Sequence, residues 1–237
     1  MGCSAEALAT YKRALRIEPN YLPALEGAAE IEYQRKNPDA KALLTRIVSL
    51  RPNDQRAHGM LGAVAFARQD CSDAVEHFRR AAELISANAE ALGQDGVCNL
   101  RLKNLGSATS DFQKILALRS DVSAVRPRLA IIYLIDQKNQ EALDVLQPLV
   151  ATDSPDPDAL ALSADAYEAM GKTPEAVSSL CQAIVLRPDK EEYYLHFADL
   201  CFTHSSYDAG VAMLTAGLKR LPKSASIYLA RGVLYVQ

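Results

Sequence analysis

The segments Ser72-Asp73-Ala74-Val75 and Thr173-Pro174-Glu175-Ala176-Val177 align on one small residue, Ala74 in the first and Ala176 in the second. Counted outward from these two, a small residue returns after one step of 33 residues and five steps of 34. Its seven positions are Ala7, Ala40, Ala74, Ala108, Ala142, Ala176 and Gly210. A fixed period of this length indicates an array of repeated structural units.

Two further columns keep the same register. A large apolar residue follows each small residue by four positions, at Tyr11, Leu44, Phe78, Phe112, Leu146, Leu180 and Leu214. A small or aliphatic residue follows three positions later, at Ala14, Ile47, Ala81, Ile115, Leu149, Ala183 and Gly217. Steps of four and three residues place side chains on one face of an α-helix. In four copies a proline then stops that helix, at Pro19, Pro52, Pro188 and Pro222.

A second small residue precedes the first by twelve positions in the full-length repeats. It occurs at Ala29, Gly62, Gly96, Ala130, Ala164, Ala198 and Gly232. Because a small side chain lets two helices approach closely, each repeat is predicted to be a pair of antiparallel helices that touch along this column. The fold class is therefore all-α.

These columns resemble the tetratricopeptide repeat family, whose pattern Leu61-Gly62, Ala74, Phe78 and Ala81 match directly. Asp95 and Ser163 depart from the pattern, since they replace its leucine. The resemblance implies a right-handed α-solenoid of antiparallel helix hairpins, a tetratricopeptide superhelix. It also implies that positions 2, 5, 9, 12 and 13 of each first helix face a concave groove.

The register predicts a single array over residues 1–237. A lone second-type helix is expected at 4–17 and a lone first-type helix at 225–237. Complete hairpins are expected at 22–50, 55–85, 89–119, 123–153, 157–187 and 191–221. The last helix is apolar nearly all round, and terminal repeats usually need a polar cap. We therefore expect either a fragment of a longer repeat protein or ends that pair with another copy.

Composition argues against several classes of function. The formal net charge of −3 lacks the basic excess of nucleic-acid binders, and no apolar run of about 18 residues predicts a membrane span. The five cysteines are odd in number and contain no Cys-x-x-Cys pair, so neither a disulfide framework nor a zinc site is expected. A cytoplasmic location is expected, unless a targeting segment lies outside this sequence.

No motif for catalysis, metal binding or cofactor binding is found, so a non-enzyme without cofactors is expected. His58 and His77 fall on the two helices of one hairpin, and His196 and His204 lie on one helix, where all four are expected at surfaces or edges. Cys181 and Cys201 fall on adjacent helices and are interpreted as partly buried free thiols.

The groove positions predict a surface with an apolar middle and acidic flanks. The apolar middle consists of Gly59, Ala63, Phe66, Gly93, Val97, Leu100, Ile131, Leu134 and Ile135. The flanks consist of Glu26, Glu30, Asp165, Glu168 and Asp199. An exposed apolar strip usually marks an interaction site. We expect a protein partner, either a helix or an extended peptide, with apolar anchors and basic flanks. The alternative is that an absent part of the chain or a second copy covers the strip.

Three functions stay open at this point. The first is a scaffold that binds a protein or peptide in the groove. The second is the repeat arm of a larger enzyme or of a secretion or assembly machine, which would recruit substrates to it. The third is a structural module that self-associates through the helix at 225–237.

Overall fold

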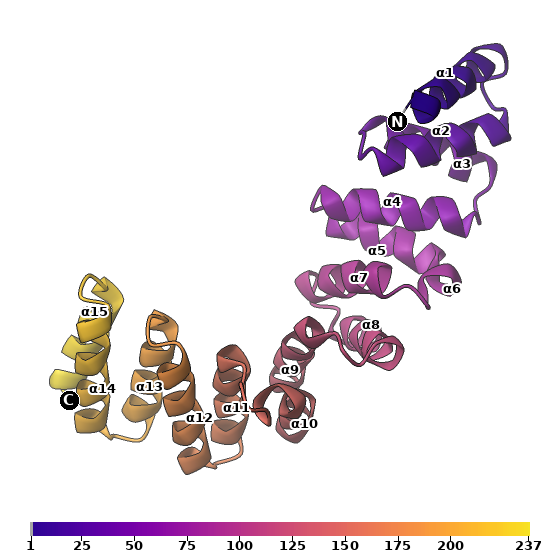
Figure 1. Cartoon of the computed structure of the whole chain (residues 1–237). Helices are drawn as coiled ribbons and strands as arrows, with labels where there is room; N and C mark the ends of the chain where they lie inside the picture. The colour runs from indigo at the N-terminus through magenta and orange to yellow at the C-terminus, as the bar shows by residue number, and fades with distance from the viewer. Residues whose placement is uncertain (1) are drawn as a thin grey trace. The chain divides into compact units, whose positions relative to one another are not determined.

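The computed structural model describes residues 2–237, with side chains from Ser4 onward. All regular structure in this part of the chain is helical. The chain divides into two compact units, unit 1 (residues 1–122) and unit 2 (residues 123–237). Within each unit, consecutive helices pack as antiparallel neighbours (Figure 1).

Unit 1 contains eight α-helices among its described residues. They are α1 (Gly2–Ile17), α2 (Leu22–Gln34), α3 (Asp39–Leu50), α4 (Gln55–Ala67), α5 (Cys71–Arg80), α6 (Ala82–Ile85), α7 (Ala89–Arg101) and α8 (Leu105–Leu118). Helices α2 and α3, α4 and α5, and α7 and α8 form hairpins. Helix α6 follows α5 after a break at Ala81, within the range predicted for one helix.

Unit 2 begins with a short 3-10 helix, η1 (Ser123–Val125). Its α-helices are α9 (Arg126–Ile135), α10 (Asn139–Val150), α11 (Pro157–Ala169), α12 (Thr173–Leu186), α13 (Glu191–Thr203), α14 (Tyr207–Arg220) and α15 (Ala225–Tyr235). Helix α9 begins at Arg126, and Pro127, which lacks an N–H, is accommodated in its first turn. Helix α1 begins two residues before the predicted range of 4–17, and the other helices lie inside the ranges expected for them. The organisation of the chain as one continuous array stays a prediction.

The repeat columns form the core of each hairpin. The small residues Ala74, Ala108 and Ala176 are fully buried, as are the aromatic rings of Phe78 and Phe112. A Cβ atom added at Gly62 would lie 2.7 Å from the ring of Phe78. The small-residue column of α4 therefore lets the first helix approach the aromatic ring of the second.

One hairpin has a polar cluster in this core. Asp95, which stands where the family pattern has leucine, is buried beside Asn99 and Asp111. The Asn99 Nδ2 atom donates to Asp95 Oδ1 at 3.1 Å and to Asp111 Oδ2 at 3.3 Å. Burial, and then the charge of Asp111, raise the pKa of Asp95 to about 7. The Asn99 amide, which donates to both carboxyl groups, thus compensates for the replacement of leucine by Asp95.

The expectation of no disulfide is wrong at one pair. Cys71, the first residue of α5, is joined to Cys98 of α7 by a disulfide, with the two Cα atoms 4.8 Å apart. The two residues are 27 positions apart in sequence, so no short motif reveals them. Their contact arises because α5 and α7 of successive hairpins pack together. Cys181 and Cys201 are free thiols, as expected.

We predict that Gly62→Ala destabilises unit 1, because the new methyl group would overlap the ring of Phe78. Overpacking of this kind costs about 1–3 kcal/mol. Gly106→Ala is the matched control, since nothing lies within 4 Å of a Cβ atom at that helical position. Thermal unfolding followed by circular dichroism should show a lower midpoint for Gly62→Ala only. Equal midpoints for the two variants would contradict this packing.

We also predict that Asp95→Asn raises stability at alkaline pH. The folded-state pKa of Asp95, about 7, exceeds the value of about 3.9 for an unfolded chain. The folded state therefore binds a proton that the unfolded state has lost, and this contribution to stability disappears as pH rises through 7. The unfolding midpoint of the variant minus that of the wild type should be larger at pH 8 than at pH 5. Asp153→Asn, in an exposed loop, should show no such pH-dependent difference.

Candidate functional site

The first helices of the unit 1 hairpins line three cavities. The smallest, about 170 Å³, lies between α2 and α4 and includes Glu26, Glu30 and Arg56. The second, about 190 Å³, lies among α2, α4, α6 and α7. The third, about 800 Å³, has a floor that includes Ala63, Phe66 and Ala67 of α4. Unit 1 therefore offers three cavities beside its first helices.

The predicted apolar groove residues lie at half-buried or exposed positions of first helices. Gly59, Ala63 and Phe66 lie on α4, and each lines at least one of the cavities. The other unit 1 members, on α7, are half-buried: Gly93, Val97 and Leu100. The unit 2 members are on α9: Ile131, Leu134 and Ile135. Of these, Ile131 is 39% exposed and Ile135 57% exposed. Each unit therefore carries its own set of accessible apolar residues.

The acidic flanks are less available than the sequence indicates. Glu26 pairs with Arg51 at 3.0 Å, and Glu30 pairs with Arg56 at 2.6 Å. Arg51 and Arg56 lie after the glutamates in the sequence, and neither is among the predicted site residues. Exposed ion pairs contribute about 0–1 kcal/mol each, so a partner could displace them.

The unit 2 flank residues surround a cavity of about 310 Å³ between α11 and α13, with Asp165, Glu168 and Asp199 in its lining. His196 contacts Asp165 at 2.7 Å, and His204 contacts Glu168 at 2.6 Å. The hydrogen bond to Asp165 raises the pKa of His196 against the opposing effect of burial. The histidines that the sequence placed at edges are therefore partners of the flank carboxylates.

Three polar side chains in unit 1 were not among the predicted site residues: Tyr33, Glu90 and Gln94. All three line both of the larger cavities. Burial, followed by the charges of Glu90 and Glu30, raises the pKa of Tyr33. Tyr33 and Glu90 occupy groove positions of the repeat register and could have been found from it. Gln94 occupies none of those positions, and no sequence signal marks it.

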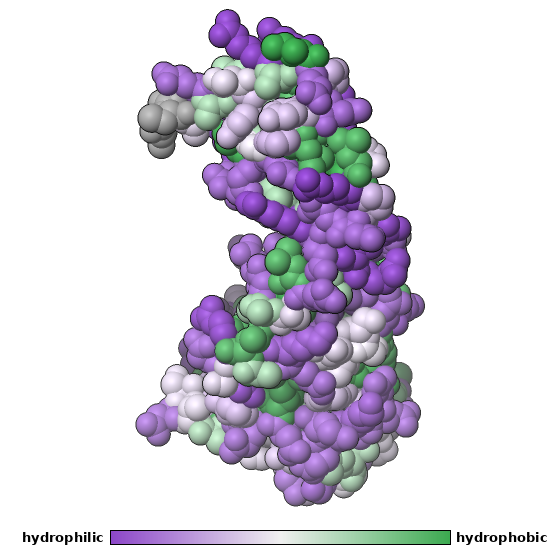
Figure 2. All heavy atoms as spheres, turned by 90° about the vertical axis from the view of Figure 1, so that its right-hand side faces the viewer, coloured by the Kyte–Doolittle hydropathy of each residue, from purple (hydrophilic) through white to green (hydrophobic). Residues whose placement is uncertain are grey.

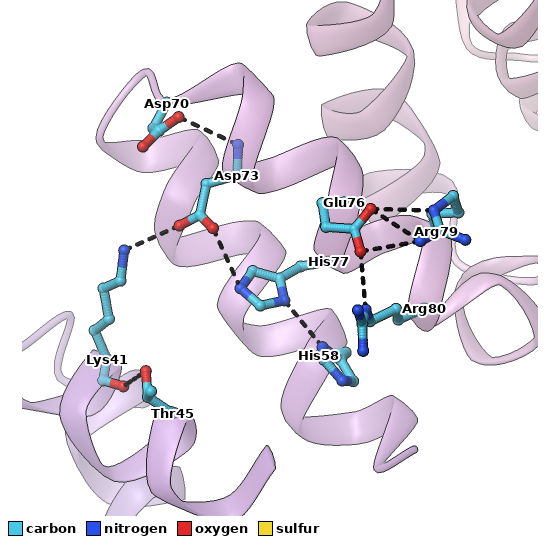
Figure 3. Close-up of polar contacts among 9 residues, drawn as sticks. All are labelled: Lys41, Thr45, His58, Asp70, Asp73, Glu76, His77, Arg79 and Arg80. Atoms are coloured by element: carbon cyan, nitrogen blue, oxygen red, sulfur yellow. Dashed lines mark hydrogen bonds and ion pairs between the residues drawn. The ribbon is translucent and has the colours of Figure 1, made fainter. Parts of the chain in front are cut away.

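A second polar cluster joins two hairpins of unit 1 (Figure 3). His58 is buried, and its Nδ1 atom lies 2.9 Å from Nδ1 of His77. Its Nε2 atom lies 3.0 Å from the carbonyl oxygen of Pro52, which can only accept a hydrogen bond. His58 therefore donates through Nε2 and, when neutral, accepts at Nδ1 from His77. Asp73 contacts His77 on one side and Lys41 of α3 on the other. This chain of contacts is a structural link between hairpins.

The described residues contain no group of three or more His, Cys, Asp or Glu side chains placed to hold a metal ion. No helix within residues 2–237 is long and apolar enough to cross a membrane. The face drawn in Figure 2 is largely hydrophilic, and its apolar side chains gather in small separate groups. The cavities of unit 1 and the α11–α13 cavity are candidates for contact with a partner.

Comparison with known proteins agrees with the repeat columns. A model of the family described as tetratricopeptide repeat matches residues 32–89. No curated protein matches the chain significantly in sequence. Many solved structures share the fold; because the identities below are under 25%, these likenesses concern the fold alone.

Three structures illustrate the likeness. MamA residues 41–end from Desulfovibrio magneticus RS-1 matches with a TM-score of 0.63 and 19% identity, over 72% of this chain and 97% of that one. YrrB, described as a TPR protein with an unusual peptide-binding site, gives 0.65 and 18%, over 77% and 95%. TTC0263, a thermophilic TPR protein of Thermus thermophilus, gives 0.55 and 19%, over 77% and 100%.

The family match shows that residues 32–89 consist of tetratricopeptide repeats, and the 34-residue columns and helical hairpins along the rest of the chain are similar to them.

Proposed function

We propose that this chain is a non-catalytic scaffold that binds a peptide or helix of a partner protein against its first helices. Stacked helical repeats create extended concave surfaces that such proteins use for binding. The bound segment contributes apolar anchors to the groove residues and basic residues to the acidic flanks. The similarity to YrrB, whose description includes a peptide-binding site, supports the same kind of role here.

The observation that carries the proposal is the cavity of about 800 Å³ in unit 1. Its volume lies within the range of small-molecule pockets, about 300–1,000 Å³. Ala63 and Ala67 leave room above the α4 backbone, while Phe66 supplies an aromatic surface. A large apolar side chain inserted there would displace water from these groups and provide much of the binding free energy.

The flanks have a smaller role in this proposal. Because Glu26 and Glu30 already contact Arg51 and Arg56, a basic residue of the partner would exchange one ion pair for another. Such an exchange adds little affinity, but complementary charge still guides encounter and register. In unit 2, Asp199 forms none of the ion pairs found among the described residues. In this proposal it guides the encounter with a basic residue of the partner.

We predict that Phe66→Asp abolishes selection of peptides by the chain, because it places a charge on the floor of the cavity. A displayed library of random twelve-residue peptides, selected against the wild type and the variant, measures this. Leu118→Asp is the control, since Leu118 is exposed on α8 and lies outside the cavities, whereas Phe66 is half-buried and lines the largest of them. Both variants should keep the helical circular dichroism of the wild type.

Enrichment of a common peptide motif by the wild type and the control, but not by Phe66→Asp, supports the proposal. Enrichment of the same motif by Phe66→Asp would show that peptides bind elsewhere. The absence of any motif on the wild type would contradict peptide binding altogether.

A second candidate function rests on α15. Its side chains Leu229 and Tyr235 are 72% and 66% exposed, and nothing lies within 4 Å of a Cβ atom at Gly232. The equivalent glycines Gly62 and Gly96 contact the ring of a paired helix. Helix α15 thus has an uncovered packing face of the kind that mediates self-association.

For this candidate, sedimentation velocity across a wide range of protein concentrations should detect a dimer or larger species. Leu229→Asp should shift the chain to the monomer, because it places a charge on the uncovered face. A wild type that stays monomeric at every concentration would exclude self-association through α15.

A further inference from the structure

The two larger cavities of unit 1 meet at a shared wall. Tyr33 of α2, Ala63 of α4, and Glu90 and Gln94 of α7 line both of them. This junction combines a buried hydrogen-bond acceptor, a carboxylate and aromatic surface, and these groups restrict what a bound side chain can be.

The acceptor is Oε1 of Gln94. It is buried and has no hydrogen-bond partner among the described residues. The amide nitrogen of the same side chain lies 3.5 Å from Oε1 of Glu90. A flipped amide would bring two oxygens together, so the carboxylate fixes the orientation and leaves the acceptor unpaired. A buried acceptor without a donor costs free energy that a bound donor would recover.

The carboxylate of Glu90 is the second feature. It forms none of the salt bridges found within the described part of the chain, whereas the nearby Arg56 is engaged by Glu30 at 2.6 Å. Lys36 and Arg68 line only the larger cavity. Burial raises the pKa of Tyr33, and the negative charge of Glu90 raises it further. The junction therefore favours a cationic donor.

The third feature is aromatic surface. Tyr33 and Phe66 both line the larger cavity beside Glu90 and Gln94. A planar cation can stack on such rings while its edge donates hydrogen bonds. An ammonium group lacks the plane, and an indole supplies only one N–H and no charge.

We propose that the partner segment inserts an arginine side chain at this junction, where its guanidinium donates to Gln94 Oε1 and to the Glu90 carboxylate. This inference rests on the proposed peptide-binding function and names one residue that the bound peptide must contain. The arginine enters the cavity itself, in contrast to the basic residues expected at the acidic flanks.

The test starts from the peptides selected by the wild type from the random twelve-residue library. The consensus peptide is synthesised with its arginine, with lysine and with alanine in that place, and binding is measured by fluorescence anisotropy. We expect the consensus to contain an arginine, and we expect lysine to weaken binding by about tenfold. Gln94→Met and Glu90→Gln should each remove most of the difference between arginine and lysine.

Two controls separate this effect from general damage. Glu18→Gln removes one carboxylate from unit 1 at an exposed site just after α1 and should leave the preference for arginine unchanged. The thermal midpoint of Gln94→Met should be equal to or above that of the wild type, because the variant removes an unpaired buried acceptor.

The outcomes distinguish the two proposals. A consensus that depends on Phe66 but lacks arginine, or an arginine preference that survives both Gln94→Met and Glu90→Gln, overturns this inference and leaves the proposed function standing. A wild type that enriches no peptide overturns both.

Discussion

The close approach of two helices at a small-residue column is the constraint on which this structure depends. At Gly62 and Gly96 the first helix presents no side chain, and the rings of Phe78 and Phe112 occupy the space. This contact sets the spacing within these two hairpins, so the remaining faces of the first helix are left for other contacts. The cavities of unit 1 are lined by those faces. The proposed binding surface is therefore a consequence of how the core is packed.

The same geometry explains why the site is mainly apolar at its floor and polar at its edges. Small residues such as Ala63 and Ala67 keep the α4 backbone accessible, and longer side chains from α2 and α7 reach over it. Charged groups at the edges find partners within the chain, as Glu30 does with Arg56. Two groups at the junction differ from these: the Gln94 oxygen has no hydrogen-bond partner among the described residues, and the Glu90 carboxylate accepts from the Gln94 amide but forms none of the salt bridges found there. A surface of this kind can select a partner through one or two directed contacts.

The sequence alone predicts most of the fold, because the repeat columns are local and each has one structural meaning. It predicts less of the site, because ion pairs and disulfides join residues from different repeats. Arg51 and the Cys71–Cys98 pair have no motif that could reveal them, whereas Arg56 occupies a groove position of the repeat register but its pairing with Glu30 does not follow from it. The His58–His77 contact was missed for a similar reason, since two side chains on facing helices meet only once the crossing of those helices is known. Gln94 lies between groove positions and lines cavities that only the packed helices create.

The most direct test of the central claim is a methyl nuclear magnetic resonance spectrum of the labelled chain, recorded with and without a selected peptide. If the partner binds against the first helices of unit 1, the methyl signals of Ala63 and Ala67 should shift or broaden, while those of Leu118 on α8 stay unchanged. Shifts confined to α5 and α8, with Ala63 and Ala67 unaffected, would contradict the account.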